Sequence, residues 1–302
     1  MLKKIMLFSI ITCSFAFFSA CSSKTANAQK DPSKVQISVT FNALGELAEA
    51  VGKDKVQVTV MTPDGMEPHD FEPKAKDLEA LSDGNVFVYN GLGMEAWVEQ
   101  TLEAVGNDKL EVVEASKGFD PIKNKDTAES ADYGQYDPHL WLSLKGAENA
   151  AKNIRDALIK ADPSNTDYYE KNYQDFSDVL DSLYGEYSLK FKEVSNKSFV
   201  TGHAAFAYLC RDFGLTQNSV EDVFADGEPS AKKLKQLADY CRERGIKTVF
   251  AEDLVSPRVS ETLAVEVGAK IEKIYTLESK EDNKDYIQSM KDNLERIYLS
   301  LK

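Results

Sequence analysis

Residues 163–194 read PSNTDYYEKNYQDFSDVLDSLYGEYSLKFKEV and form the longest helical pattern in this 302-residue chain. Apolar side chains recur there in steps of three and four, which puts them on one face of a helix: Tyr169, Tyr173, Phe176, Leu180, Leu183, Tyr187 and Phe191. Gly185 weakens such a helix by about 1 kcal/mol relative to Ala but need not break it. The helix would be on the order of 45 Å long, so we expect it to join two halves of the protein and to limit domain closure.

Short apolar runs alternate with helical patterns on both sides of this segment. Four runs precede it, at 37–40, 56–61, 86–89 and 110–113, and four follow it, at 199–201, 219–223, 248–251 and 270–275. Strands that alternate with helices indicate βαβ units and parallel sheets. The sequence therefore predicts an α/β protein with two similar parallel-sheet lobes joined by one long helix.

The two halves also resemble each other in sequence. Residues 72–81 (EPKAKDLEAL) and 228–237 (EPSAKKLKQL) are identical at six of ten positions. In each segment a Pro stands near the start of the helix, where its missing N–H is not needed. The likeness fits a duplicated lobe, although unrelated βαβ units share such patterns too. Both interpretations predict two α/β lobes.

The first residues have a pattern typical of export. Two lysines precede an apolar run at 5–18 and the sequence FSAC at 18–21. A short basic region, an apolar core and small residues predict a secretory signal peptide at 1–20, and the run is too short for a comfortable membrane span. Cys21 resembles the acylated Cys of the bacterial lipobox. An ordinary signal peptide without acylation is the alternative.

The length of the chain predicts more than one domain, because roughly 270 mature residues exceed one ordinary hydrophobic core. The patterns above divide the chain into five segments. These are a signal peptide at 1–20, a polar lipid-anchored tether at 21–34, an N-terminal lobe at 35–162, a linking helix at 163–194 and a C-terminal lobe at 195–302.

The charge of the chain excludes a nucleic-acid partner. The formal net charge is −14, and it becomes −16 when the two lysines of the signal peptide are removed. Such a surface repels nucleic acid and anionic lipid, so an acyl chain would have to supply membrane binding. We expect a monomer. Cys210 and Cys241 remain after export, in a compartment that permits a disulfide, and whether they pair is left open.

The sequence contains three histidines, and each lies in a loop beside Pro or Gly. His69 and His203 come after predicted strands, where ligands bind in open α/β sheets, and His139 precedes a predicted helix. Neutral imidazole is a common ligand of Zn²⁺. A lone His more often has a structural or surface role, and separations of 70 and 64 residues carry no local signature. The residues alone leave both interpretations open.

Four motifs occur in the same order as in one known family. They are PHDFEP at 68–73, DPHLWL at 137–142, TGHAAFAY at 201–208 and EPS at 228–230. With them, residues 35–302 resemble the metal-binding components of bacterial zinc and manganese ABC importers, known as cluster A-I or zinc-uptake lipoproteins. The resemblance implies two α/β lobes joined by one long helix and a metal site in the cleft between them. It also implies an extracytoplasmic, membrane-anchored protein that delivers its metal to an ABC transporter permease.

The resemblance further implies a set of metal ligands for a transported Zn²⁺: His69, His139, His203 and Glu278. Zinc members keep His at the third position, where manganese members generally have Glu, and the sequence IYTLES at 274–279 is similar to the segment that supplies their carboxylate. Three imidazoles and one carboxylate form a closed tetrahedral site suited to Zn²⁺. Thr276 stands where many relatives have Pro. If Glu278 pointed to solvent for that reason, water or Glu67 would take the fourth position.

Several other functions are alternatives to zinc transport. A manganese- or iron-binding member of the same family and an adhesin are the alternatives within the family. A zinc hydrolase leaves one metal position open for water, whereas Glu278 would fill that position here. The sequence also lacks a His-Glu-x-x-His motif, so we expect no enzyme. Residues 115–137 form an acidic loop without His, which argues against metal storage there.

Overall fold

The computed structural model describes residues 30–124, 135–224, 229–254 and 256–302. The predicted signal peptide at 1–20 and the acylation site at Cys21 lie outside these residues. Within them, no helix is both long enough and apolar enough to span a membrane.

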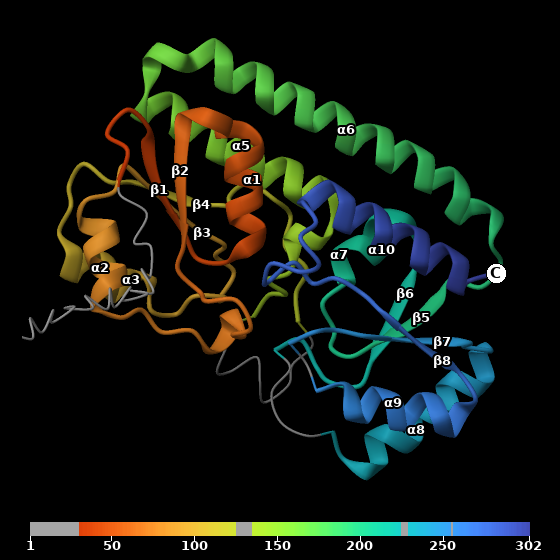
Figure 1. The fold of residues 1–302 in the computed structure, drawn as a ribbon. Helices are drawn as coiled ribbons and strands as arrows, with labels where there is room; N and C mark the ends of the chain where they lie inside the picture. Colours follow the sequence, from red (N-terminus) through yellow and green to blue (C-terminus); the bar gives the residue numbers. More distant parts are fainter. Residues whose placement is uncertain (1–29, 125–134, 225–228, 255) are drawn as a thin grey trace, which may run out of the picture. The chain divides into compact units, whose positions relative to one another are not determined.

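The N-terminal lobe is built on a four-stranded parallel sheet (Figure 1). Its strands, in the spatial order β2-β1-β3-β4, are β1 (Val35–Val39), β2 (Val56–Val60), β3 (Val86–Tyr89) and β4 (Glu111–Glu114). The central strand β3 is apolar on both faces because helices cover both sides of the sheet. Val86 and Val88 face α1 (Asn42–Gly52) and α5 (Leu144–Ala161), whereas Phe87 faces α2 (Ala75–Ser82) and α3 (Val98–Val105).

The C-terminal lobe repeats this topology. Its parallel sheet has the order β6-β5-β7-β8, with β5 (Ser198–Thr201), β6 (Thr216–Ser219), β7 (Thr248–Ala251) and β8 (Lys270–Lys273). Its helices are α7 (Ala207–Phe213), α8 (Ala231–Arg244), α9 (Pro257–Val267) and α10 (Tyr286–Ser300). The predicted fold class, two similar parallel-sheet lobes with one long connecting helix, is confirmed.

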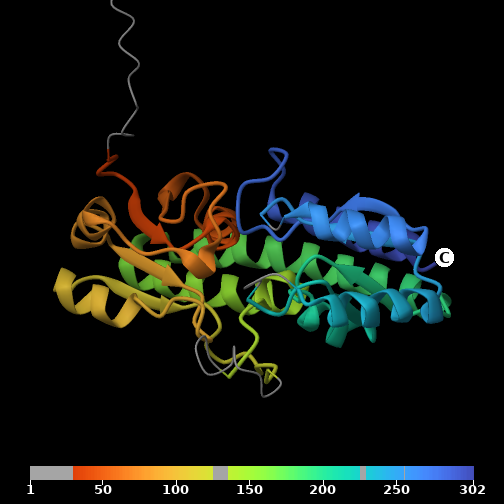
Figure 2. The same ribbon diagram turned by 90° about the horizontal axis from the view of Figure 1, so that it is seen from below.

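The connecting helix is α6 (Thr166–Glu193), which follows a short 3-10 turn at Pro163–Asn165. It runs beside both lobes in Figures 1 and 2. Its predicted apolar face is buried at Tyr169, Phe176, Leu180, Leu183, Tyr187 and Phe191, and Gly185 does not interrupt it. One hydrophobic core extends from β1, through α6, to Phe250 on β7 and Tyr275, so the two lobes share packed side chains.

One predicted strand is displaced. The strand expected at 219–223 begins three residues earlier and ends four residues earlier, as β6, whose sequence is Thr-Gln-Asn-Ser. Because β6 is an edge strand that pairs only with β5, it need not be apolar, and the apolar pattern that suggested the strand comes instead from the loop after it. The two cysteines, Cys210 on α7 and Cys241 on α8, are buried in different cores and free.

Candidate metal centre

Each predicted ligand is carried by a short, well-anchored segment at the lobe boundary. His69 lies in a 3-10 turn (Pro68–Asp70) after β2, with Pro68 at the first position of the turn. His139 directly precedes a second such turn (Leu140–Leu142). His203 follows β5 and Glu278 lies on the loop after β8, so three of the four come from the carboxyl ends of sheet strands, where open α/β sheets bind ligands.

The imidazole nitrogens converge on one point. The Nε2 atom of His139 lies 3.3 Å from Nε2 of His69 and 3.3 Å from Nε2 of His203. Two ligands at the usual zinc–nitrogen distance of about 2.0–2.1 Å from one tetrahedral ion would be about 3.3–3.4 Å apart. These two distances are therefore those that one shared zinc ion requires.

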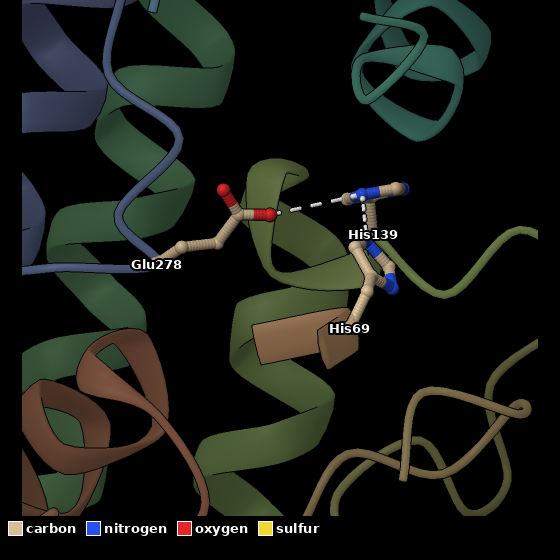
Figure 3. Close-up of side chains that lie close together, drawn as sticks. All are labelled: His69, His139 and Glu278. Carbon is tan, nitrogen blue, oxygen red and sulfur yellow. Dashed lines mark hydrogen bonds and ion pairs between the residues drawn. The ribbon is translucent and has the colours of Figure 1, made fainter. Parts of the chain in front are cut away.

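The carboxylate of Glu278 faces the same point. Its Oε1 atom lies 3.8 Å from Nε2 of His139 (Figure 3). The potential ligand atoms of His69, His139 and Glu278 all lie within 4.8 Å of one another. His203 lies outside that tight group and joins it through its contact with His139. The structure thus brings all four predicted residues to one place.

The site contains buried polar atoms that lack partners among the described residues. Both carboxylate oxygens of Glu278 and Nδ1 of His69 are buried without a hydrogen bond, and Glu278 is 2 % exposed. A buried polar group without a partner is costly, more so when it is charged. A cation bound between Glu278 and the Nε2 atoms of the imidazoles would supply the missing partner of the carboxylate, so the donor set fits Zn²⁺.

The pKa values of the ligand side chains reflect the same burial. Burial raises the pKa of Glu278 well above its ordinary value, and the nearby Glu67 raises it further. Burial lowers the pKa of His139, and the neighbouring His203 lowers it further. Burial also lowers the pKa of His69, and His139 adds to this effect. Two of the three imidazoles are therefore neutral near neutral pH, which is the form that binds metal.

Two further carboxylates orient the imidazoles. Oδ1 of Asp137 accepts hydrogen bonds from the backbone N–H and from Nδ1 of His139, each at 2.9 Å. Glu252, which follows β7, accepts from the backbone N–H of His203 at 3.2 Å and bonds its Nδ1 through the other oxygen. A carboxylate on Nδ1 holds the ring and leaves Nε2 facing the metal position. Neither residue was predicted from the sequence to have a role at the site, although a carboxylate directly after the strand predicted at 248–251 was a usable signal.

His203 differs from the other imidazoles in charge. Burial lowers its pKa, but Glu252 outweighs burial and raises the pKa to about 10. Without metal, His203 is therefore an imidazolium paired with a carboxylate. A metal ion that binds its Nε2 must displace a proton.

The loop of Glu278 is held from both lobes despite the Thr at position 276. Thr276 is buried, and its carbonyl accepts a hydrogen bond from the indole N–H of Trp141 at 2.8 Å. The alternative in which Glu278 points to solvent is wrong. Glu67 remains close, with Oε1 3.9 Å from Nε2 of His69, and this oxygen also lacks a hydrogen-bond partner in the described part of the chain.

This chain is similar in sequence to known zinc-uptake and metal-binding proteins. The sequence model of one protein family, described as "Zinc-uptake complex component A periplasmic" (ZnuA), matches residues 37–299. A protein of Treponema pallidum (strain Nichols) named for metal binding is 43% identical over 287 residues, which cover 92% of this chain and 91% of that protein. The high-affinity zinc uptake system protein ZnuA of Bacillus subtilis (strain 168) is 36% identical and covers 98% of this chain and 97% of its own.

One further relative is a longer protein, and another similar protein is named for adhesion. The zinc-binding lipoprotein AdcA of Streptococcus pneumoniae (strain R6) is 33% identical over 98% of this chain, which spans 60% of AdcA. Among solved structures, a mutant of the laminin-binding adhesin Lmb of Streptococcus agalactiae has a TM-score of 0.82 and 34% identity, covering 89% of this chain and 100% of that one. Another structure of Lmb is described as bifunctional, with adhesin and metal transporting activity.

Proposed function

The chain belongs to the family of periplasmic zinc-uptake component A proteins, and on that premise we propose that it captures Zn²⁺ with high affinity outside the cytoplasm and delivers it to an ABC importer. The observation that carries the proposal is that Nε2 of His139 lies 3.3 Å from Nε2 of both His69 and His203, beside the buried, unpartnered carboxylate of Glu278. ABC permeases are the partners with which this family works.

We propose His69, His139, His203 and Glu278 as the four ligands of one zinc ion. Three nitrogens and one carboxylate oxygen suit Zn²⁺, whereas Mn²⁺ favours more oxygen ligands. Four protein ligands also leave no position for a water nucleophile, which supports transport rather than hydrolysis. The burial of the set, with Glu278 at 2 % exposure, supports tight binding because a bound ion would exchange slowly with water.

Metal analysis tests this proposal most simply. Protein purified without chelator should contain one zinc per chain, and the His203→Ala variant should bind zinc much more weakly in a competition titration. His69→Ala and His139→Ala should lose more affinity than Glu278→Ala, because three imidazoles can still hold the ion when the carboxylate is removed. Two comparable tight sites, or unchanged binding in His203→Ala, would count against it.

We further propose that Cys21 carries a lipid anchor and that the protein is a monomer on the extracytoplasmic face of the membrane. The support is the lipobox-like FSAC sequence at 18–21 and the similarity to AdcA, which is named a lipoprotein. The test is fractionation of cells that express the wild type and Cys21→Ser. The variant should leave the membrane fraction, and a variant that stays membrane-bound would contradict the anchor.

Adhesion is a second candidate function, favoured by the similarity to Lmb. Purified protein should then bind immobilised laminin with or without bound zinc. Absence of saturable binding in both states would remove this candidate and leave the zinc proposal untouched.

A further inference from the structure

The backbone that presents Glu278 has an unusual conformation. The preceding residue, Leu277, has φ 58°, in the left-handed region that a branched side chain rarely occupies. Such a residue persists only when its surroundings hold it in place. The conformation turns the Glu278 side chain toward His139, as Figure 3 shows.

Glu281 supplies the local support. Its Oε1 atom accepts a hydrogen bond from the backbone N–H of Leu277 at 3.3 Å, and the residue is buried. A buried carboxylate needs a counter-charge, because burial disfavours its charged form and raises the pKa of Glu281. The side chain that opposes this effect most strongly is Lys273, at the end of β8.

Lys273 connects the Glu278 loop to the segment that supports His203. Its Nζ atom lies 3.4 Å from Oε2 of Glu281 and 3.2 Å from Oδ2 of Asp282, both on the Glu278 loop. The same Nζ atom lies 2.6 Å from Oδ2 of Asp253, the neighbour of Glu252. One ammonium group thus joins the two loops of the C-terminal lobe that lead to the proposed metal position.

We propose that Lys273 and Glu281 are positioning residues that hold Glu278 in its metal-facing orientation. This inference rests on the proposed zinc site. Lys273 holds the side chain of Glu281 through the 3.4 Å contact, Glu281 fixes the N–H of Leu277, and Leu277 directs the next side chain inward. The rival interpretation is that the cluster only stabilises the fold.

The first test measures zinc affinity of Lys273→Gln by chelator competition. We expect the dissociation constant to rise by about 10-fold, the lower end of the range seen when residues that orient metal ligands are changed. The matched control is Lys270→Gln. Lys270 lies on the same strand, is exposed and pairs with Glu272, so its removal takes away the same charge without touching the loop. Equal affinities for the wild type and Lys273→Gln would overturn the proposal.

A double-mutant cycle separates positioning from general stability. In a Glu278→Ala background the Lys273→Gln change should no longer alter zinc affinity, because the side chain that it positions is gone. An undiminished loss in that background would assign Lys273 a structural role only and overturn the proposal. If wild-type protein binds no zinc, the proposed function itself fails, which is a different result from either outcome of the cycle.

Variants of Glu281 give an independent test should Lys273→Gln fold poorly. Glu281→Gln keeps an oxygen that accepts from Leu277 and needs no counter-charge, so we expect near wild-type affinity. Glu281→Ala lacks the acceptor and should weaken binding about as much as Lys273→Gln. Equal affinities for these two Glu281 variants would contradict the role of the Leu277 hydrogen bond.

Discussion

Asp137 and His139 are joined twice, because one oxygen of Asp137 accepts from both the backbone N–H and the ring Nδ1 of His139 at 2.9 Å. The carboxylate is itself buried, and burial raises its pKa to about 7. The carbonyl of Asp137 accepts from the hydroxyl of Tyr208 on α7 at 2.6 Å, so the C-terminal lobe also holds this segment. The central imidazole of the proposed site is thereby fixed in both orientation and tautomer.

Loss of this double contact should weaken zinc binding without removing a ligand. Asp137→Ala is expected to raise the dissociation constant by about 10–100-fold, because the ring of His139 becomes free to turn. Asp137→Asn should lose less, since its amide oxygen can still accept from Nδ1. The measurement is chelator competition on both variants. Asp137→Ala with wild-type affinity would show that the ring is held by other contacts.

Zinc binding should release protons near neutral pH. The pKa of His203 is about 10, so this ring holds a proton in the metal-free protein, and burial of Glu278 raises its pKa and so favours its protonated form. Binding replaces these protons, and apparent affinity must therefore fall as the pH is lowered. Calorimetry in buffers of different ionisation enthalpy should report release of at least one proton per zinc at pH 7. A heat that is independent of the buffer would argue against His203 and Glu278 as ligands.

Removal of the buried charge should stabilise the metal-free protein. Because the pKa of Glu278 is raised by folding, its contribution to stability is present below the unfolded value of 4.5 and is lost as the pH rises through the folded value. Glu278→Gln without metal is therefore expected to be more stable than the wild type at pH 8, by about 1–3 kcal/mol. Thermal unfolding with chelator present measures this difference. A less stable Gln variant would mean that the carboxylate already has a partner.

The stability order should reverse when zinc is present. A ligand that binds only the native state stabilises it, by about 2.7 kcal/mol at a hundredfold excess over its dissociation constant. The wild type has the carboxylate that Glu278→Gln lacks, so it should gain more from zinc. Equal shifts in the unfolding temperature of the two proteins would contradict a role for Glu278 in binding.

Shortening the acidic loop should leave zinc binding intact. The ends of the loop are already joined, since Lys123 and Tyr136 form an antiparallel bridge and the N–H of Asn124 donates to the carbonyl of Gln135 at 2.8 Å. Replacement of residues 125–134 by a short Gly-Ser turn should therefore preserve the fold and the affinity. Loss of tight binding with unchanged circular dichroism would reveal a ligand in that loop.

The large features of the fold followed from periodicity. The helical face of α6 and the strands β1, β3 and β7 could be predicted because their apolar residues are buried between helices and leave a regular pattern. The edge strand β6 could not be placed, since its polar residues tolerate exposure and only pairing with β5 defines them. The pattern of side chains along the sequence does not show which strands hydrogen-bond to each other.

The candidate site, too, could be predicted only in part from the sequence. The three histidines were recognisable because they are scarce and lie in Pro- or Gly-flanked loops, and Glu278 was found through a family resemblance. Glu252 lies 49 residues from His203, and Lys273 lies eight residues from Glu281. Their roles depend on which carboxylate approaches which ring or ammonium after the lobes fold, and sequence spacing carries no information about that.

Metal-bound geometry tests the four-ligand proposal most directly. A structure of the zinc-bound protein should place one carboxylate oxygen of Glu278 about 2.0–2.2 Å from the metal, with Nε2 of His69, His139 and His203 at about 2.0–2.1 Å. A Glu278 oxygen well beyond coordination distance, with water or Glu67 in its place, would contradict the four-ligand site while leaving the three-histidine site standing.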